Sequence, residues 1–494
     1  MSTSLHLIDR IDLWADRCPD RSAHFSGGRG LTWRQLVDQS NALALWLDDT
    51  LSGQPGPIAV HGHKESEMIV AFLAAVKCGR PYVPMDAAIP EQRIAKIVAG
   101  AGAVMVLTPE KVRSVLAENI SSDGRRPAQR VEGEDPFYIL FTSGSTGEPK
   151  GVVITLKNLT SFVNWLLSEH SFAECAEVFL NQAPFSFDLS VMDLFGSLTT
   201  GGTLASVTKE ELSNLKSLYA MLGTSGVTVW VSTPSFAQMC LIEKGFGAQM
   251  LPAMSRFLFC GETLAPETAS QLLERFPAAE VWNTYGPTEA TVATTSVRVD
   301  KALLERYSPL PVGYAMAGTR VLVAGESGQE VPEGERGEIV IVGPNVSPGY
   351  LNKPDITAKA FREWDGQRCY RTGDWGRVKA GLVFFEGRMD GQVKVNGYRI
   401  ELGDLEANLR TLEEVADVVV LPIQKNGKID GLASFVVLSG PKSGTDFEVT
   451  SRLKTQLGQR LPAYMIPRKF VYLDAFPMTT NGKADRRKLA ELLG

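Results

Sequence analysis

A glycine-rich segment in the first third of the chain carries residue types that could hold a phosphate. Residues 141 to 152 read FTSGSTGEPKGV, with three glycines, two serines and two threonines around one lysine. Glycines let the backbone turn its N–H groups toward anionic oxygens, hydroxyls donate further hydrogen bonds, and the lysine adds positive charge. The candidate phosphate ligands are Thr142, Ser143, Gly144, Ser145, Thr146, Gly147 and Lys150.

The spacing of this segment excludes a Walker loop and leaves two interpretations open. A Walker loop needs four residues between its glycines, followed by Gly-Lys-Ser/Thr. Here two residues separate Gly144 from Gly147, and Lys150 is followed by another glycine. The segment is therefore either a phosphate-binding loop of another kind or a flexible surface turn.

A single carboxylate stands out in an apolar segment further along the chain. Asp188 is flanked by Phe185, Phe187, Leu189 and Val191. A buried carboxylate needs a partner, because otherwise it loses its charge. The alternatives are a helix N-cap and a surface aspartate, and the apolar flanks weigh against both.

Strands and helices alternate along the part of the chain that must position these groups. Residues 57 to 63, 81 to 86 and 103 to 108 are apolar runs of strand length, while 68 to 76 and 90 to 102 have helical spacing. Such alternation predicts α/β structure with parallel sheets. Ligands of these sheets gather beyond the carboxyl ends of the strands.

The same alternation returns at 227 to 243 and 256 to 286. The segment NTYGPTEAT, residues 283 to 291, follows a predicted strand, as the phosphate candidate does. Both segments are thus expected at the edge of a sheet where ligands bind.

The sequence pattern changes at about residue 310. From there on it predicts short β-strands separated by glycines, as in GEIVIVGP at 337 to 344. The last hundred residues predict two helices, 403–412 and 449–459, and two strands, 417–422 and 433–439.

We therefore predict an α/β protein of two domains. The N-terminal domain, 1–389, has α/β subdomains with mainly parallel sheets and a β-rich subdomain. A small α+β C-terminal domain covers 390–494, with the boundary at the Asp390-Gly391 pair.

Composition and charge exclude several classes of protein. The net charge of -6 disfavours general nucleic-acid binding, which needs a basic face. Six widely spaced cysteines form no metal or disulfide framework, which is typical of free thiols in a reducing compartment. The N-terminus has no signal-peptide core, and the apolar run at 68–76 is too short to span a bilayer. We expect a cytoplasmic monomer without membrane insertion.

Five further segments now join the first. They are NTYGPTEAT, YRTGDWGR (370–377), FEGRMDGQVKVNGYRIEL (385–402), LPAYMIPRKF (461–470) and NGKADRR (481–487). In this order and spacing, the six resemble the acyl-adenylate-forming superfamily of amino-acid adenylation domains, acyl-CoA synthetases and luciferases. The resemblance covers the chain from residue 31 to its end.

Four segments narrow this resemblance to one family, the D-alanine–D-alanyl carrier protein ligases. They are VFLNQAPFSFDLSVMDLF, STPSFAQMCL, FLFCGETL and NTYGPTEATVA. The family implies formation of D-alanyl-AMP from D-alanine and ATP, with Mg²⁺, and transfer of the acyl group to the 4′-phosphopantetheine thiol of a D-alanyl carrier protein. That thioester feeds D-alanylation of teichoic acids.

The resemblance also assigns the nucleotide-binding residues. It implies that 142–150 closes over the β- and γ-phosphates, that Glu289 binds Mg²⁺, and that Asp374 accepts the ribose hydroxyls. The adenine and α-phosphate wall would be formed by Asn283, Thr284, Tyr285, Gly286, Pro287 and Thr288. The nucleotide site would be completed by Phe385, Glu386, Gly387 and Arg388.

For the amino acid, the resemblance implies that Asp188 binds the α-ammonium. Cys260 and Val292 would line the space around a small side chain. Lys483, carried on a mobile C-terminal domain, would touch the substrate carboxylate and the α-phosphate, and Asp390 would be the hinge of that domain.

Two alternatives stay open, since preference for D- over L-alanine rests on resemblance alone. One is a stand-alone adenylation enzyme that loads L-alanine or another small amino acid onto a carrier protein for secondary metabolism. The other is a catalytically inactive nucleotide-binding regulator.

Overall fold

The computed structural model describes residues 5–118, 127–144, 147–389, 391–395, 398–425, 428–479 and 484–493. The chain divides into two compact units. Unit 1 comprises 1–86, 101–140 and 151–389, and unit 2 comprises 87–100, 141–150 and 390–494. Unit 2 thus contains the phosphate candidate besides the C-terminal region, and a functional division of the chain at 389/390 stays a prediction.

The first of two large sheets has six strands in the order β17-β7-β6-β4-β3-β5. Its strand β3 pairs in parallel with β4 and β5, and β17 runs antiparallel to β7. Helix α4 (Ser66–Lys77) connects β3 to β4, and Gly79 follows it with a φ of 74°, the left-handed conformation that ends many helices. The strands are β3 (Ile58–Gly62), β4 (Tyr82–Asp86), β5 (Met105–Leu107), β6 (Pro136–Thr142), β7 (Lys150–Thr155) and β17 (Gly349–Tyr350).

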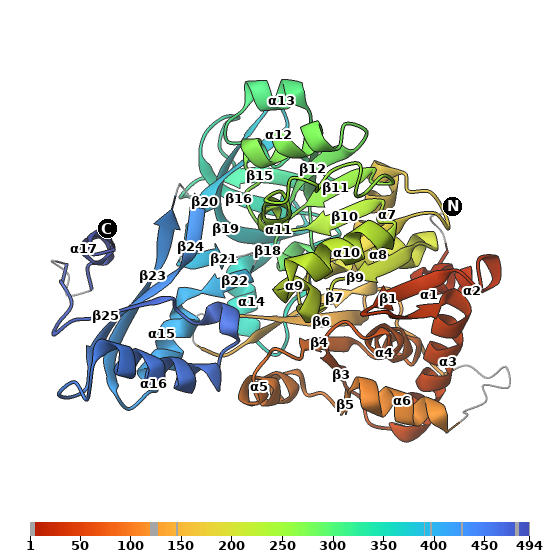
Figure 1. Cartoon of the computed structure of the whole chain (residues 1–494), viewed down its shortest axis with the longest axis horizontal. Helices are drawn as coiled ribbons and strands as arrows, with labels where there is room; N and C mark the ends of the chain where they lie inside the picture. The colour runs from red at the N-terminus through yellow and green to blue at the C-terminus, as the bar shows by residue number, and fades with distance from the viewer. Residues whose placement is uncertain are drawn as a thin grey trace. The chain divides into compact units, whose positions relative to one another are not determined.

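The second sheet has nine strands in the order β14-β13-β12-β11-β10-β8-β9-β1-β2 (Figure 1). All neighbours from β12 to β1 are parallel, so the carboxyl ends of six strands share one edge. The strands are β1 (Ser22–Ser26), β2 (Arg29–Thr32), β8 (Val178–Asn181), β9 (Thr203–Ser206), β10 (Val229–Ser232), β11 (Arg256–Phe259), β12 (Glu280–Tyr285), β13 (Thr295–Val299) and β14 (Tyr314–Ala315).

The third sheet of unit 1 is antiparallel throughout. It contains β15 (Arg320–Ala324), β16 (Gly337–Val342), β18 (Phe361–Trp364), β19 (Gln367–Lys379) and β20 (Leu382–Arg388). The register of the β19–β20 pair sets Asp374 opposite Arg388. This sheet is the β-rich subdomain that the glycine-punctuated sequence predicts.

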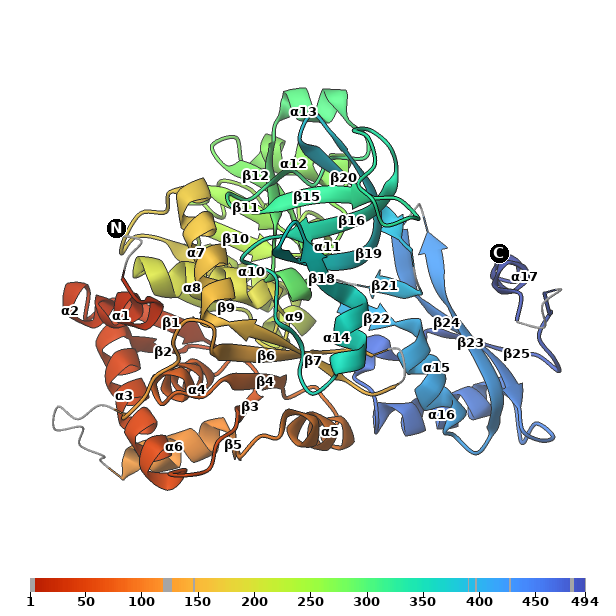
Figure 2. The ribbon, with the colours of Figure 1, turned by 180° about the vertical axis from the view of Figure 1, so that it is seen from behind.

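Helices flank the sheets of unit 1 (Figure 2). Helix α8 (Leu189–Thr200) is buried along its whole length, and its polar side chains, such as Ser197 and Asp193, form hydrogen bonds inside the protein. The others are α1 (Leu7–Asp12), α2 (Trp14–Arg17), α3 (Trp33–Thr50), α6 (Pro109–Ala117), α7 (Leu156–His170), α9 (Lys209–Ser213), α10 (Leu215–Ser225), α11 (Pro234–Cys240), α12 (Pro266–Arg275), α13 (Lys301–Arg306), α14 (Pro354–Ala360) and the short 3₁₀ helix η1 (Thr288–Ala290).

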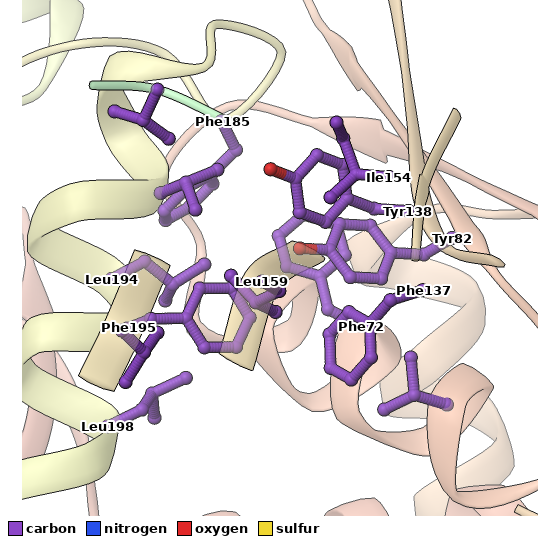
Figure 3. Close-up of a cluster of buried hydrophobic side chains, with 14 of the residues drawn as sticks. Phe72, Tyr82, Phe137, Tyr138, Ile154, Leu159, Phe185, Leu194, Phe195 and Leu198 are labelled. Carbon is purple, nitrogen blue, oxygen red and sulfur yellow. The ribbon is translucent and has the colours of Figure 1, made fainter. Parts of the chain in front are cut away.

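An aromatic cluster in the core of unit 1 reaches the segment that carries Asp188. Figure 3 shows Phe72 of α4, Tyr82 of β4 and Phe185 pointing toward one another. The ring of Phe72 stacks on Tyr82 at 4.3 Å and meets the edge of Phe185 at 5.6 Å between centroids. Such pairs add directional contacts to apolar burial. Phe185 therefore anchors the turn three residues before Asp188.

Unit 2 contains the small α+β arrangement predicted for the end of the chain. A three-stranded sheet, β23-β24-β25, packs its apolar face on α15 and α16 through buried residues that include Val418, Leu405 and Leu453. The elements are α5 (Glu91–Ala101), β21 (Gln392–Val395), β22 (Tyr398–Glu401), α15 (Leu402–Arg410), β23 (Val415–Lys425), β24 (Lys428–Leu438), α16 (Asp446–Gly458), η2 (Ala463–Met465), β25 (Lys469–Tyr472) and α17 (Arg486–Glu491).

The predicted fold class is confirmed, and the predicted elements lie within a few residues of the observed ones. The helices expected at 403–412 and 449–459 correspond to Leu402–Arg410 and Asp446–Gly458. Along the described parts of the chain, no helix combines the length and apolar character needed to cross a membrane.

Candidate nucleotide and amino-acid site

The turn after β12 brings several predicted residues to the carboxyl edge of the nine-stranded sheet. At Gly286 an added Cβ would lie 2.6 Å from Ala293 Cα and 2.7 Å from the Val292 carbonyl, so a larger residue cannot fit without moving the backbone. Thr291 and Val292 have φ angles of 57° and 70°, a conformation that is strained for a β-branched residue. The sequence thus encodes a tight, buried turn.

Asn345 fixes this turn from the side. Its amide nitrogen donates to the Ala290 carbonyl at 2.9 Å and to the Thr294 hydroxyl at 3.0 Å, and its own carbonyl accepts from Thr291 at 2.7 Å. Its side-chain oxygen accepts from Thr319 at 2.9 Å. Since Asn345 is fully buried, these bonds form away from water. Together they hold the strained backbone of Thr291 and Val292 in place.

Tyr285, Asp374 and Arg388 form the charged centre of the candidate nucleotide region. The Tyr285 hydroxyl donates to Asp374 Oδ2 at 2.5 Å, and Arg388 donates to Asp374 Oδ1 at 2.7 Å. Burial, and then the Asp374 charge, raise the pKa of Tyr285 well above its ordinary value, so Tyr285 stays a hydrogen-bond donor. Three residues that the sequence predicts from separate motifs are therefore brought together.

The neighbouring predicted residues take different positions. The Phe385 ring lies 5.9 Å from the Tyr285 ring, between centroids, which gives two aromatic faces near Asp374. Gly387 has a φ of 106° and no atom within 4 Å of an added Cβ. Glu386 points elsewhere, since its carboxylate pairs with Arg377 and with Arg336. A direct nucleotide contact of Glu386 stays a prediction.

The side chains of Asn283 and Thr284 form hydrogen bonds to backbone carbonyls of the protein. Asn283 donates to the Pro311 carbonyl at 2.8 Å, and Thr284 donates to the Phe259 carbonyl at 2.8 Å. Pro287 precedes η1 and leads the chain into it. These bonds position the segment, so any contact of Asn283 or Thr284 with nucleotide would have to come through the remaining atoms.

Glu289 supplies a carboxylate of the kind that Mg²⁺ binds. It is fully buried, its Oε1 accepts from the Tyr350 hydroxyl at 2.8 Å, and its backbone carbonyl accepts from Ser347. Among the residues that the structure describes, no group of three or more His, Cys, Asp or Glu could hold a metal ion. The donor set fits an ion completed by phosphate oxygens rather than a cage made by protein alone.

Asp188 lies beside the nucleotide motif, at the start of α8. Its Oδ2 accepts from the Thr288 hydroxyl at 2.6 Å. It occupies the N-cap position, but its side chain makes no capping hydrogen bond. The carboxylate is thus held toward the turn after β12, which weakens the N-cap interpretation.

Cys260 and Val292, the two predicted side-chain contacts, lie next to each other. Cys260 directly follows β11, and its thiol donates to the Val292 carbonyl at 3.7 Å. Both are buried. The structure therefore brings together the two small apolar residues, while their role in selectivity stays a prediction.

The phosphate candidate belongs to unit 2, where its described residues have defined partners. Ser143 donates to the Arg399 carbonyl and accepts from the Glu401 N–H, both at 3.1 Å, and Lys150 lies 3.8 Å from the Glu401 carboxylate. At Gly144 an added Cβ would lie 2.2 Å from the Glu148 carbonyl.

One feature of this loop favours ligand binding over a surface turn, whereas the left-handed φ of 84° at Gly147 fits both interpretations. The Thr142 hydroxyl is buried and has no hydrogen-bond partner within the described residues. Such an orphaned donor is costly unless a ligand or water satisfies it.

Four predicted residues, Ser145, Thr146, Asp390 and Lys483, lie outside the described residues. The catalytic lysine, the hinge and the tip of the phosphate candidate therefore stay predictions.

Sequence reasoning missed a buried polar network beneath the Asp188 turn. Lys64 donates to the Asn181 side chain and to the Ala183 carbonyl, and it lies 4.8 Å from the centre of the Phe185 ring. Asn181 in turn donates to Asp193 Oδ1 at 2.8 Å. These contacts support both ends of the segment that leads to Asp188. In the sequence, the one signal for this network is the position of Lys64 directly after a predicted buried strand.

Burial shifts the titration of this network toward neutral forms. It lowers the pKa of Lys64 to about 7, against the attraction of Asp193 and Asp86, and raises the pKa of Asp193 well above its usual range. His24 bonds to Ser66 at 2.7 Å and to Ser206 at 2.9 Å. Burial, and then Lys64, lower the pKa of His24 to about 3.

Known proteins resemble this chain over nearly all of its length. The family model for AMP-binding enzymes matches residues 11–351, and the model for the AMP-binding enzyme C-terminal domain matches 404–483. A D-alanine–D-alanyl carrier protein ligase of Bacillus anthracis is 47% identical over 498 residues, covering 98% of this chain and 99% of the relative. The ligase of the same name from Bacillus cereus strain B4264 is 46% identical, with the same coverage.

Solved structures show the same fold. The Vibrio cholerae adenylation domain AlmE, in complex with glycyl-adenosine-5′-phosphate, has a TM-score of 0.84 at 22% identity and covers 99% of this chain and 97% of its own. NpsA-ThdA, an artificially fused adenylation-PCP di-domain from Klebsiella oxytoca, has a TM-score of 0.82 at 26% identity, with coverages of 94% and 93%. The chain belongs to the AMP-binding enzyme family and groups, within it, with the D-alanine–D-alanyl carrier protein ligases.

Proposed function

We propose that this chain activates D-alanine with ATP and transfers the alanyl group to the 4′-phosphopantetheine thiol of a D-alanyl carrier protein, as in D-alanylation of teichoic acids. The observation that carries the proposal is the bond from Thr288 to the Asp188 carboxylate. It joins a carboxylate suited to an amino acid's ammonium to the motif that contains Tyr285 and Glu289. The names of the full-length relatives supply D-alanine and the carrier protein.

The first half-reaction forms an acyl phosphate. A carboxylate oxygen of D-alanine attacks the α-phosphorus of ATP, the bond to the β-phosphate oxygen breaks, and pyrophosphate leaves. Asp188 would hold the ammonium of the amino acid, and the pair of Asp374 and Arg388 would hold the ribose. Mg²⁺, bound through Glu289, would neutralise charge on the phosphates.

The second half-reaction forms the thioester. The thiol sulfur attacks the alanyl carbonyl carbon, the bond to the phosphate oxygen breaks, and AMP leaves while the thiol proton passes to solvent. Lys483, by resemblance, would act in the first half-reaction. Preorganised positive charge of this kind is worth about 10²–10³ in rate per group.

The amino-acid pocket is proposed to favour a methyl side chain. Cys260 and Val292 are both small, and the Cys260 thiol contacts the Val292 carbonyl. An extra methylene in an apolar pocket is discriminated by only about 1–3 kcal/mol, so glycine and serine should react weakly rather than not at all.

The test is amino-acid-dependent ATP–pyrophosphate exchange, run with D-alanine, L-alanine, glycine and L-serine. We expect D-alanine to give the highest kcat/KM. L-Alanine as the best substrate would favour the alternative of a secondary-metabolism enzyme, and absence of exchange with all four would favour an inactive regulator.

An Asp188→Asn variant separates amino-acid binding from nucleotide binding. We expect exchange to fall about 10²-fold, because the half-buried Asp188 would lose its charge, and a hydrogen bond to a charged group is worth about 1.5–3 kcal/mol. Nucleotide affinity, measured by calorimetry, should change little. Asp300→Asn is the control, since Asp300 caps α13 and asparagine caps helices equally well.

A further inference from the structure

Two cysteines that are far apart in the sequence meet in unit 1. Cys18 is the residue that ends α2, and Cys175 lies in the loop that leads to β8. Their Sγ atoms are 2.9 Å apart, although 157 positions separate the residues. Both residues are partly exposed. A disulfide needs a separation of about 2.05 Å, so a shift of less than 1 Å would allow the bond to form.

Contacts on both sides of the cysteines hold the two segments together. Arg17 pairs with Glu174 at 3.0 Å, and Arg21 donates to the Ala176 carbonyl at 2.9 Å. The Cys175 N–H donates to the Thr200 carbonyl at 2.8 Å. The juxtaposition therefore does not depend on the thiols themselves.

The packing under Cys175 also leaves little room for the thiol to turn away. An added Cβ on Gly201 would lie 2.6 Å from the Trp14 ring and 3.0 Å from Cys175 Sγ. Cys175 has a φ of 51°, a left-handed conformation that is uncommon for cysteine. The backbone at Cys175 is thus set in the position that directs its sulfur toward Cys18.

We propose that Cys18 and Cys175 form a reversible disulfide when the protein meets a low-molecular-weight disulfide such as oxidised glutathione. The Cys175 thiolate attacks one glutathione sulfur, forms a mixed disulfide and releases one glutathione thiolate. The Cys18 sulfur then attacks Cys175 Sγ, loses its proton to solvent and releases the second glutathione. One glutathione disulfide is reduced to two thiols, and the two protein thiols are oxidised to one disulfide.

The order of the two attacks follows from the environment of Cys18. Burial, and then its contact with Cys175, raise the pKa of Cys18 to about 12, so Cys18 is the weaker nucleophile toward a molecule in solution. When Cys175 carries a glutathione, Cys18 attacks the mixed disulfide from a fixed position next to it. This proximity compensates for the small fraction of Cys18 that is present as thiolate.

The disulfide would fasten the N-terminal segment 14–21 to the loop between α7 and β8, which contacts the end of α8 through the bond from Cys175 N–H to the Thr200 carbonyl. Cross-linking positions so far apart removes much conformational freedom from the unfolded chain, which is the main source of disulfide stabilisation. The link lies at the end of α8 remote from Asp188, about 18 Å away for a helix of this length. Stability is therefore expected to change while activity does not.

The experiment incubates the purified full-length protein with oxidised glutathione and counts free thiols after denaturation. We expect the count to fall from six to four and to return to six with dithiothreitol. Trypsin cuts after Arg17, Arg21, Lys157 and Lys209, so mass spectrometry should find residues 18–21 joined to residues 158–209. The linked protein should melt several degrees higher, with D-alanine-dependent exchange within about twofold of the reduced protein.

Variants test the pairing. Cys18→Ser and Cys175→Ser should each abolish the linked peptide and the rise in Tm, whereas Cys78→Ala, which keeps both partners, should still lose two thiols. The proposal is overturned if six thiols persist, if Cys175 stops at a glutathione adduct, or if the linked peptides involve other cysteines. An unchanged Tm in fully linked protein would overturn the stabilising effect.

Discussion

Asp374 and Asp193 are two buried carboxylates of unit 1, and each has a basic side chain close by. Asp374 accepts directly from Arg388 at 2.7 Å, and the Arg388 side chain keeps 16% of its surface exposed. Asp193 reaches Lys64 through the Asn181 amide, and burial shifts the pKa values of both end groups toward their neutral forms. The first arrangement keeps a carboxylate next to a fixed cation at the edge of a sheet.

The difference indicates two roles for similar chemistry. A direct carboxylate–guanidinium pair with part of its surface open can exchange contacts with a ligand. A bridged pair without access to water instead stabilises the segments that it joins, because every polar group in it must find a protein partner. The comparison predicts that changes at Asp374 affect activity first, while changes at Lys64 affect stability first.

The largest effect is expected for Asp374→Asn. The substitution removes the charge that Arg388 faces and replaces one carboxylate oxygen, which would accept a ribose hydroxyl, by an amide nitrogen that cannot accept. Each hydrogen bond to a charged group is worth about 1.5–3 kcal/mol. We expect kcat/KM for ATP in pyrophosphate exchange to fall about 10²–10³-fold, with a Tm that changes little by comparison. Asp365→Asn, at an exposed ion pair with Arg320, is the matched control. A normal KM for ATP in Asp374→Asn would remove Asp374 from the nucleotide site.

Lys64→Ala should reduce stability more than activity. It removes the aliphatic stem and one donor each from Asn181 Oδ1, which still accepts from Ser206, and from the Ala183 carbonyl, which still accepts from the Asn181 amide. We expect the free energy of unfolding to fall by about 3 kcal/mol. Lys64→Met also lacks the ammonium but keeps an apolar stem, so the loss should stay below about 1.5 kcal/mol. Urea unfolding measures both variants. Equal losses would show that the stem contributes little and that the lost ammonium accounts for the effect, because both variants lack it.

The pH dependence of stability should carry a contribution from His24. Its folded pKa of about 3 lies below the unfolded value of 6.5, so the unfolded chain binds the proton first and stability is lost as pH falls from 6.5 toward 3. Between pH 6.5 and pH 5 this amounts to about 1.7 kcal/mol. His24→Gln does not titrate, so its unfolding free energy should fall less over the same range. Parallel pH profiles of both proteins would contradict this assignment.

The smallest effect is expected for Tyr285→Phe. The change keeps the aromatic face beside Phe385 and removes only the hydroxyl bond to Asp374, which is worth about 0.5–1.5 kcal/mol. Exchange activity should fall about tenfold or less. A loss as large as that of Asp374→Asn would mean that the hydroxyl, rather than the ring, is the main contribution of Tyr285.

The sequence predicted the elements well where periodicity was strong. The strand at 58–62 and the helix at 66–77 are each uniform in their apolar pattern, and both were located from it. The antiparallel neighbours β13, β14 and β17 were not predicted, because pairing between strands of a mixed sheet depends on contacts that no local pattern records. Resemblance, rather than spacing, placed Cys260 with Val292, whereas it gave Asp188 and Thr288 separate roles and only the structure shows the bond between them.

Supporting residues were harder to find than the motifs. Asn345 is one asparagine in a loop, and only the structure shows that it bonds three groups of the turn after β12. Lys64 reads as a surface lysine, since lysines are seldom buried. Lys64 bonds to a residue 117 positions away, and Asn345 bonds to one 54 positions away. Local sequence patterns carry no signal over such separations.

The left-handed backbone at Val292 has a consequence for redesign of the pocket. A β-branched residue at a φ of 70° is held there against a cost of about 1–3 kcal/mol, which glycine would not incur. Laboratory evolution toward bulkier amino acids should therefore find Val292→Gly early, since it enlarges the cavity and relaxes the main chain at once. Enlarging the proposed pocket through Cys260 offers no such relief, so its two proposed walls differ in how readily selection can move them.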